Sequence, residues 1–172
     1  MQVKKGGFRI TKEGYNEMSL SDLVAYIMKV QQPYLRTTLS SLRNNPETIR
    51  MQEKGSKRAA VLAAVVENLA VLVEKHLDEK ETQIFPLMIK KVENPKTPLP
   101  ESQIRKIKEQ QGEIKECLIT LRRLSNEYEA PPGSIPLLKL CYAQLFNFEQ
   151  DMLKSIFLEE EILFQKLIKP VH

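Results

Sequence analysis

Apolar residues recur along the chain at alternating spacings of three and four, which is the spacing of one face of an α-helix. Such seams run through four stretches that we expect to be helical, at roughly 19–44, 57–91, 101–129 and 135–168. Loops containing proline or glycine separate these stretches, and no stretch alternates with the period of two that is typical of a strand. The pattern predicts an all-α fold, an antiparallel four-helix bundle with up-down-up-down topology.

The chain is expected to contain one folded domain with a short polar extension. Its length of 172 residues fits a single domain. Residues 1–18 are polar and carry no apolar seam, so we expect a polar N-terminal arm outside the bundle. The bundle itself is expected over residues 19–169. Pro33 lies inside the first predicted helix, where it removes a backbone donor and should bend the helix.

Polar residues interrupt each of the four seams near the middle of its helix. Residues four apart on a helix lie on one face, so these side chains should project into the interior together. A buried polar group is costly unless others satisfy it, so polar residues converging from four helices predict a polar layer inside the bundle. The alternative is that a register error of one residue places some of them on the surface. The interrupting residues are Gln32, His76, Lys80, Gln111, Ser155 and Glu159.

The segments around these positions are similar to the motifs of a known family. Residues 31–36 read Gln-Gln-Pro-Tyr-Leu-Arg and resemble His-His-x-Tyr-Leu-Arg. Residues 76–86 read His-Leu-Asp-Glu-Lys-Glu-Thr-Gln-Ile-Phe-Pro and resemble His-Met-x-Lys-Glu-Glu-x-x-Leu-Phe-Pro. Residues 155–165 read Ser-Ile-Phe-Leu-Glu-Glu-Glu-Ile-Leu-Phe-Gln and resemble His-Ile-x-Leu-Glu-Asn-x-x-Leu-Phe-Pro. Over about residues 19–168 the chain resembles the hemerythrin-like (HHE) di-iron proteins, most closely the helical domain of the iron-sulfur cluster repair branch.

The resemblance implies that most of the family's metal ligands are replaced in this chain. Family histidines would fall at Gln32, His76, Gln111 and Ser155, and bridging carboxylates at Lys80 and Glu159. Iron needs several imidazole and carboxylate ligands, whereas glutamine and serine are poor ligands and an ammonium repels a cation. We therefore expect no metal or other cofactor. We also expect Lys80 and Glu159 to pair in the core, with the ammonium supplying the positive charge that the metals would have supplied.

These features predict a degenerate hemerythrin-like bundle without a competent di-iron site. We expect a non-enzymatic interaction or regulatory protein that binds an unknown protein partner or forms a homodimer. The alternative implied by the resemblance is an iron-binding protein of the nitric oxide or oxygen response or of iron-sulfur cluster repair. In that reading His76 and Glu159 hold a single metal ion, or Glu79, Glu81 or Glu160 join them.

The sequence gives little support for an enzymatic function. A phosphotransfer bundle that uses His76 as phospho-acceptor needs an exposed imidazole, which an inward seam position disfavours. The sequence contains no nucleophile elbow, P-loop or dinucleotide fingerprint. No catalytic residue is therefore assigned.

Composition changes this picture only in detail. The chain has 26 Lys and Arg against 22 Asp and Glu, a net charge of +4. The basic excess lies near the N-terminus and is only weak evidence for an anionic partner, and we expect no nucleic-acid binding. No apolar stretch approaches the roughly 20 residues that a membrane helix needs, and no secretory signal is expected. The two cysteines, Cys117 and Cys141, cannot form a disulfide framework and are expected to be core thiols of a cytoplasmic protein.

Overall fold

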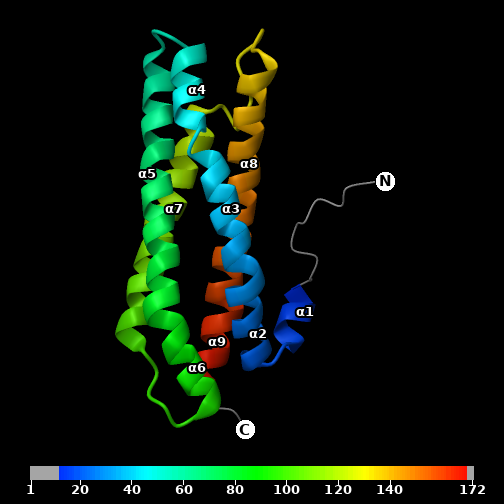
Figure 1. Ribbon diagram of the computed structural model, residues 1–172, viewed down its shortest axis with the longest axis vertical. Coiled ribbons are helices and arrows are strands. Elements are labelled where there is room, and N and C mark those ends of the chain that lie inside the picture. Colours follow the sequence, from blue (N-terminus) through cyan, green and yellow to red (C-terminus); the bar gives the residue numbers. More distant parts are fainter. Residues whose placement is uncertain (1–11, 170–172) are drawn as a thin grey trace.

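The computed structural model describes residues 12–169, and four long helices dominate its architecture (Figure 1). The first long helix consists of α2 (Leu20–Tyr26), η1 (Ile27–Gln31) and α3 (Gln32–Leu42). The second consists of α5 (Lys57–Glu79), η2 (Lys80–Ile84) and α6 (Phe85–Glu93). The third is α7 (Glu101–Leu124), and the fourth consists of α8 (Pro136–Phe157), η3 (Leu158–Leu163) and α9 (Phe164–Ile168). They run alternately up and down in Figure 1, which confirms the predicted all-α up-down-up-down bundle.

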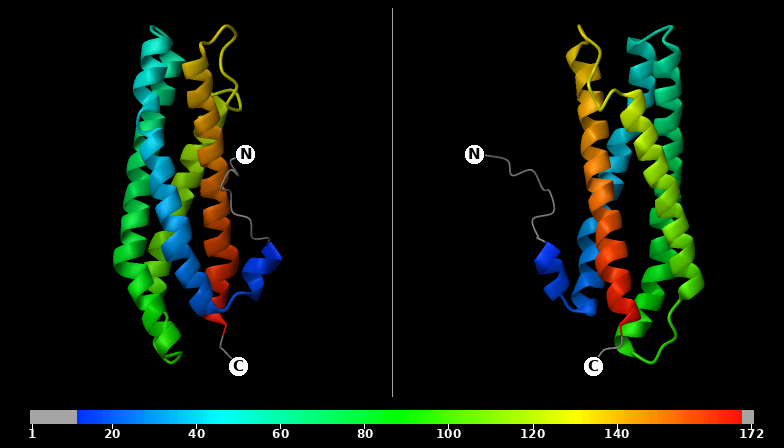
Figure 2. Two further views of the ribbon diagram at one scale, coloured as in Figure 1. Left: turned by 45° about the vertical axis from the view of Figure 1, so that its right-hand side comes forward. Right: turned by 180° about the vertical axis from the view of Figure 1, so that it is seen from behind.

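The apolar seams of the four helices meet around one elongated core. Helix α5 contacts α3 and α7, and α8 contacts the same two helices, so each long helix touches two neighbours around a ring (Figure 2). One residue from each of the four seams shows how complete the burial is. These residues are 0% exposed: Leu35, Val73, Ile114 and Met152. Each such burial contributes roughly 1.5–3 kcal/mol relative to exposure, so the predicted seams account for the main driving force of folding.

Two of the helices begin at serine caps. The Oγ of Ser19 accepts a hydrogen bond from the backbone N–H of Asp22 at 3.0 Å, and the Oγ of Ser56 accepts one from Ala59 at 3.1 Å. Each bond satisfies an N–H that has no partner within its helix. Gly55 precedes the second cap with a φ of +81°, a left-handed conformation that glycine adopts without steric cost.

The third helix is shorter than the sequence predicts. It ends at Leu124 instead of near residue 129. Beyond it, residues 126–128 have φ values of 50°, 56° and 65°, so three consecutive non-glycine residues adopt left-handed geometry. The Oγ of Ser125 accepts a hydrogen bond from the backbone N–H of Tyr128 at 2.9 Å and closes this turn. Apolar periodicity does not reveal such a side-chain-stabilised turn.

A short helix, α4 (Asn45–Gln52), lies in a segment expected to be a loop. Pro46 occupies its first turn, where the missing N–H has no helical partner to lose. The helix is tied to the bundle by Ile49, which is 0% exposed, and by Asn45, whose side chain donates to the carbonyl of Cys141 at 3.3 Å. Proline here starts a helix instead of marking a loop.

Part of the predicted polar arm packs on the bundle as a helix. Helix α1 (Lys12–Glu17) lies outside the four long helices, beside the end of α8 (Figure 2). Its Tyr15 is only 8% exposed, and the ring centroids of Tyr15 and Tyr26 lie 5.6 Å apart. Lys166 also donates to the backbone carbonyl of Asn16 at 2.7 Å, so the expectation of an arm outside the bundle needs correction at α1. Residues 1–11 of the predicted arm lie outside the described residues.

Within the described residues, none of the helices combines the length and apolar character needed to cross a bilayer.

We expect Tyr15→Ala to lower the free energy of unfolding by about 2 kcal/mol, less than a central aromatic truncation because α1 lies at the edge of the core. Tyr15→Phe keeps the ring and should lose less than half as much. Urea unfolding followed by circular dichroism measures both changes. If the alanine variant unfolds at the wild-type urea midpoint, α1 does not contribute to the bundle.

Candidate functional site

A layer of polar side chains divides the core into two apolar halves. One half contains Leu35 and Val73, and the other contains Ile27 and Ile84. All the residues that interrupt the apolar seams lie between these halves, and none is more than 1% exposed: Gln32, His76, Lys80, Gln111, Ser155 and Glu159. The structure therefore brings together the full set of predicted layer residues, and a register error does not move any of them to the surface.

An ion pair lies at the centre of this layer. The Nζ of Lys80 on η2 lies 2.5 Å from the Oε1 of Glu159 on η3, as expected from the sequence. Gln111 donates to the Oε2 of Glu159 at 3.0 Å, and the Ser155 hydroxyl donates to Oε1 at 3.4 Å. Both carboxylate oxygens therefore have donors, which offsets the loss of hydration that burial imposes on a charge.

His76 is held as a neutral imidazole by its neighbours. The Nε2 of Gln110 donates to the Oε2 of Glu79 at 2.5 Å, so its Oε1 faces the imidazole, at 3.0 Å from Nδ1. Nδ1 therefore carries the proton, and Nε2 keeps a lone pair. Burial, together with the smaller effect of the nearby Lys80 ammonium, lowers the pKa of His76 to about 3.

Gln32 links the layer to a charged cluster at the surface. Its side-chain amide donates to the carbonyl of Leu77 at 3.4 Å and to the Oε1 of Glu81 at 3.1 Å. Arg36 donates to both oxygens of Glu81, at 3.0 and 2.8 Å, and these hydrogen bonds lower the pKa of the carboxyl. Glu81 therefore remains ionised and gives the buried amide a fixed acceptor.

Three of the four long helices change to π-helical geometry near the polar layer. The π-helical turns η1, η2 and η3 lie at this level, whereas α7 is a continuous α-helix. Proline follows two of the turns, at Pro33 and Pro86, and the wider turn relieves the clash between the proline ring and the preceding carbonyls. The turn η3 forms without a following proline, since Gln165 occupies that position. Single π-helical turns of this kind occur frequently at functional sites.

The layer also contains acceptors that are not satisfied. Among residues 12–169, the Oε1 of Gln32, the Nε2 of His76 and the Oε1 of Gln111 are buried without a hydrogen-bond partner. All three atoms are acceptors, and the Lys80 ammonium is the one cation that the described residues place in this layer. The interior is therefore rich in lone pairs and suited to holding positive charge.

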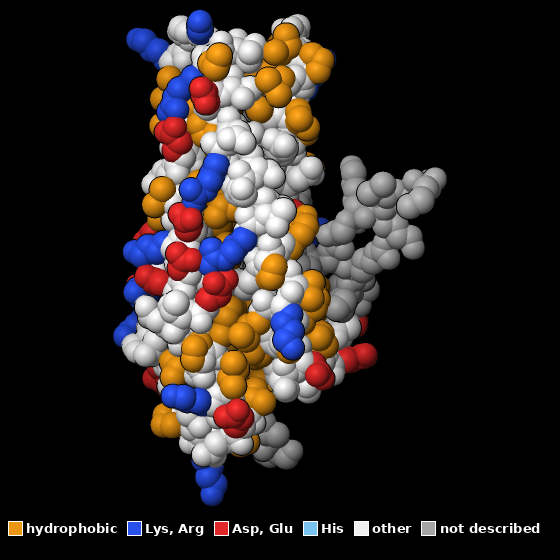
Figure 3. Space-filling model, in the orientation of Figure 1, with side chains coloured by type: hydrophobic (Ala, Val, Ile, Leu, Met, Phe, Trp, Pro, Cys, Tyr) orange, Lys and Arg blue, Asp and Glu red, His pale blue; other side chains and the backbone are white. Residues whose placement is uncertain are grey.

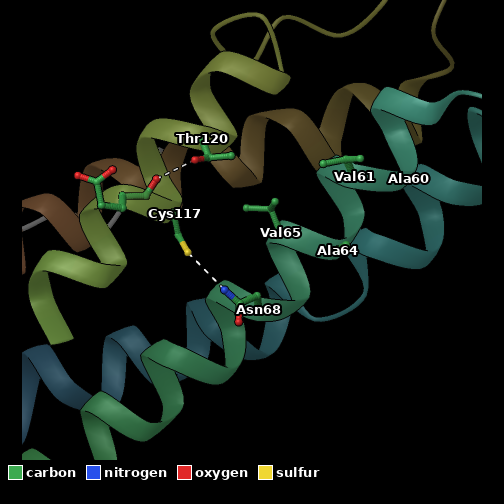
Figure 4. Close-up of a pocket in the computed structure, with 8 residues that line it drawn as sticks. Ala60, Val61, Ala64, Val65, Asn68, Cys117 and Thr120 are labelled. Atoms are coloured by element: carbon green, nitrogen blue, oxygen red, sulfur yellow. Dashed lines mark hydrogen bonds between the residues drawn. The ribbon is translucent and has the colours of Figure 1, made fainter.

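The groove between α5 and α7 is a separate feature of the surface (Figure 4). It has a volume of about 510 Å³ and is floored by small residues, including Ala60 and Ala64. Cys117 points into it and accepts a hydrogen bond from the side chain of Asn68 at 3.5 Å. Burial raises the pKa of the Cys117 thiol, so it is not an activated nucleophile. Cys117 is partly exposed, whereas Cys141 is buried as expected.

Ion pairs connect the first and second long helices across the surface. Charged side chains of both signs gather in the middle of the face shown in Figure 3, over α3 and α5. Arg36 pairs with Asp78 at 2.6 Å, and Arg43 pairs with Glu74 at 2.6 Å. These side chains are 35–58% exposed, so each pair contributes at most about 1 kcal/mol.

Sequence reasoning missed two residues of the site. Gln110, which sets the tautomer of His76, was not distinguished from the neighbouring Gln111. Gln31, which precedes Gln32 and is 1% exposed, was not named as an inward residue. Helical periodicity does not separate such neighbours, because adjacent residues such as Leu62 and Ala63 are buried together elsewhere in the bundle.

A four-helix bundle with polar side chains converging at mid-height belongs to the class of bundles with an interior site. The family is identified by its sequence model: the hemerythrin HHE cation-binding domain matches residues 24–167, and the chain belongs to this family. No curated protein matches the chain.

The donor set in this layer does not fit a di-iron centre. The Lys80 ammonium binds the carboxylate of Glu159, so the one acidic group in the layer is already neutralised. Glu79, Glu81 and Glu160, which could have joined a metal site, instead pair with Lys106, Arg36 and Lys115. Over the described residues, no cluster of three or more His, Cys, Asp or Glu is placed to hold a metal ion.

Removing one partner of the buried pair should be far more damaging than removing both. We expect Lys80→Met to lower the free energy of unfolding by roughly 3–5 kcal/mol, because Glu159 remains buried without its counter-charge. The double variant Lys80→Met with Glu159→Leu should recover most of that loss.

Denaturant unfolding of the wild type, both single variants and the double variant gives the coupling energy. Lys75→Met makes the same change on an exposed position of α5 and should alter stability by no more than about 0.5 kcal/mol. A coupling energy near zero contradicts the energetic role of the ion pair.

Stability should also depend on the protonation of His76. The unfolded chain protonates this imidazole below about pH 6.5, whereas the folded protein does so only near pH 3, so acid favours unfolding between these values. From pH 7 to pH 5 the wild type should lose about 2 kcal/mol more than His76→Gln. Urea unfolding at both pH values measures the difference. Equal losses in the two proteins would show that the imidazole is not buried as a neutral group.

Proposed function

We propose that this chain is a hemerythrin-family bundle without a competent di-iron site that works as a non-enzymatic interaction or regulatory protein. The observation that carries the proposal is the buried contact between Lys80 and Glu159. The Lys80 ammonium carries a positive charge and binds the carboxylate of Glu159 directly. A metal ion could bind this carboxylate only by displacing the ammonium, and the two positive charges would repel each other.

The remaining layer residues give the same proposal chemical support. Gln32, Gln111 and Ser155 are neutral side chains that bind iron poorly. His76 is the single imidazole among the buried layer residues. A bundle with such an interior can act through its outer surfaces, and we propose either a protein partner or a second copy of the chain. We further propose a cytoplasmic location, consistent with the free thiols of Cys117 and Cys141.

One observation favours the alternative reading. The Nε2 of His76 has no partner among the described residues, and it shares the layer with the Glu159 carboxylate. A single metal ion bound by these two groups would make the chain an iron-binding protein of the nitric oxide or oxygen response or of cluster repair. Such an ion must displace the Lys80 ammonium from Glu159.

Anaerobic titration with ferrous iron distinguishes the two proposals. We expect the purified protein to contain far less than one iron per chain by elemental analysis, and saturating iron to leave its melting temperature unchanged. Lys80→Met removes the competing ammonium and should take up metal more readily than the wild type. Stoichiometric iron in the wild type, lost in His76→Gln, would support the mononuclear alternative instead. Light scattering on the same samples determines whether the chain forms a homodimer.

A further inference from the structure

Helix α8 has a second seam on the side that faces away from the core. In the right-hand view of Figure 2, no other helix lies in front of this helix (orange). The residues of the outer seam alternate in spacing between three and four, and none of them is buried: Ala143, Phe146, Gln150, Leu153 and Phe157. Its three large apolar side chains are 42%, 37% and 40% exposed in chain order. A surface helix needs one apolar stripe to face its own core, so a second stripe indicates contact with another protein surface.

A hollow at one end of the outer seam has the form that receives a side chain from another helix. Four of the residues that line it are spaced as i, i+3, i+4 and i+7 on α8: Gln150, Leu153, Lys154 and Phe157. Four residues with this spacing form the hole that a knob of a second helix enters in coiled-coil packing. The volume of the hollow is about 380 Å³, which is ample for one aromatic side chain.

Helix α1 limits the direction from which a second helix can enter this hollow. Lys12 and Tyr15 of α1 line the hollow on the side opposite α8. The Nζ of Lys12 lies 5.2 Å from the centre of the Phe157 ring, so that ring is partly covered. An incoming side chain therefore contacts mainly the part of the hollow near Gln150 and Leu153.

The outer seam is complementary to itself about Gln150. Phe146 lies four residues before Gln150, and the hollow is centred just beyond Leu153, three to four residues after it. Ala143 and Phe157 lie seven residues before and after Gln150, so an antiparallel pair of seams places a small side chain opposite a large one. A two-fold axis through Gln150 forms each of these contacts twice. Such self-complementarity is what a symmetric interface between two copies requires.

Charged residues at the two ends of the outer seam favour the antiparallel direction. Lys139 and Glu161 are exposed, lie eleven residues before and after Gln150, and belong to none of the ion pairs of residues 12–169. Antiparallel pairing places each lysine beside a glutamate of the second copy, whereas parallel pairing places like charges together. At the centre, the two Gln150 amides can donate to and accept from each other, and one polar position in a seam fixes its register.

We propose that the outer seam of α8 binds a second copy of this chain in an antiparallel, two-fold symmetric dimer. Phe146 of each copy enters the hollow of the other, and Lys139 of each copy pairs with Glu161 of the other. One helix face per copy is a small interface, so the dimer is weak and reversible. This inference rests on the proposed function, because it specifies the partner through which the bundle acts.

Sedimentation equilibrium of the full chain over about 1 µM to 1 mM covers the range expected for so small an interface. We expect the mass to rise from one chain to two. Leu153→Lys places a charge in the seam of both copies and should raise the dissociation constant more than about tenfold. Leu137→Lys makes the same change at a position of α8 that is 50% exposed and outside the seam, and should leave the dissociation constant unchanged. Circular dichroism melting confirms that both variants are folded.

A charge exchange tests the direction of pairing. Lys139→Glu or Glu161→Lys alone should weaken the dimer about threefold to tenfold, because each places like charges together twice. The double variant should regain the wild-type dissociation constant, and an equimolar mixture of the two single variants should associate more tightly than either one alone. A parallel dimer would not show this pattern, because its single variants would exchange one like-charge contact for another.

Cysteine cross-linking locates the two-fold axis. In a Cys117→Ser background, which removes the partly exposed native thiol, Gln150→Cys should form a disulfide-linked dimer under mild oxidation. Lys139→Cys should not, because the two copies of that residue lie roughly 30 Å apart in the antiparallel dimer.

The proposal is overturned if the chain sediments as a monomer throughout, if Leu137→Lys weakens association as much as Leu153→Lys, if the double charge variant does not recover, or if both cysteine variants cross-link alike. Iron analysis remains a separate test of the proposed function. A monomer without iron would overturn the dimer alone, whereas a dimer with stoichiometric iron would overturn only the absence of a metal site.

Discussion

The contact between Lys80 and Glu159 constrains how the second and fourth long helices can pack. Both residues are at most 1% exposed, so their charges are removed from water and must be satisfied inside the protein. A one-residue slip of either helix would separate the charges and leave each buried alone, at a cost of several kcal/mol. Gln111 from α7 and Ser155 from α8 bind the same carboxylate. One carboxylate thus fixes the relative position of three of the four long helices.

Apolar packing alone would fix that position less firmly. Cores tolerate exchange among apolar residues of similar volume, and seams repeat every three or four residues, so a helix can slide by one turn at moderate cost. The polar layer breaks this repeat, because it separates the apolar half around Val73 from the half around Ile84. In this bundle, the buried ion pair supplies specificity of register more than net stability, and apolar contacts supply most of the stability.

The sequence was sufficient to predict the long helices and the members of the layer because both follow from helical periodicity. The seam through His76 and Lys80 continues across η2, and the pairing of Lys80 with Glu159 follows from two inward positions of opposite charge. Periodicity fails where the helix itself changes. Both Gln31 and Gln32 are buried at η1, and a π-helical turn, which holds more residues than an α-helical turn, shifts the face of those that follow.

Other differences arise from contacts that periodicity cannot encode. Helix α4 depends on Ile49 and on the bond from Asn45 to the carbonyl of Cys141, far away in sequence. The early end of α7 depends on the Ser125 hydroxyl and on left-handed residues that are seldom adopted by side chains other than glycine. The docking of α1 depends on Tyr15, which is isolated in a polar segment. Each of these elements is short, and a tertiary contact decides its structure.

Gln31 at the end of η1 and Gln32 at the start of α3 each bury an Oε1 that has no hydrogen-bond partner among the described residues. Gln31 lines a pocket that α1 and α8 also line, while Gln32 lies in the polar layer and donates to Leu77 and Glu81. Because the two glutamines are consecutive, a force that shifts the backbone at Gln31 also shifts Gln32. Helices bend at π-helical turns and at proline, and η1 is followed by Pro33. The first long helix therefore has its bending point where Gln31 and Gln32 adjoin.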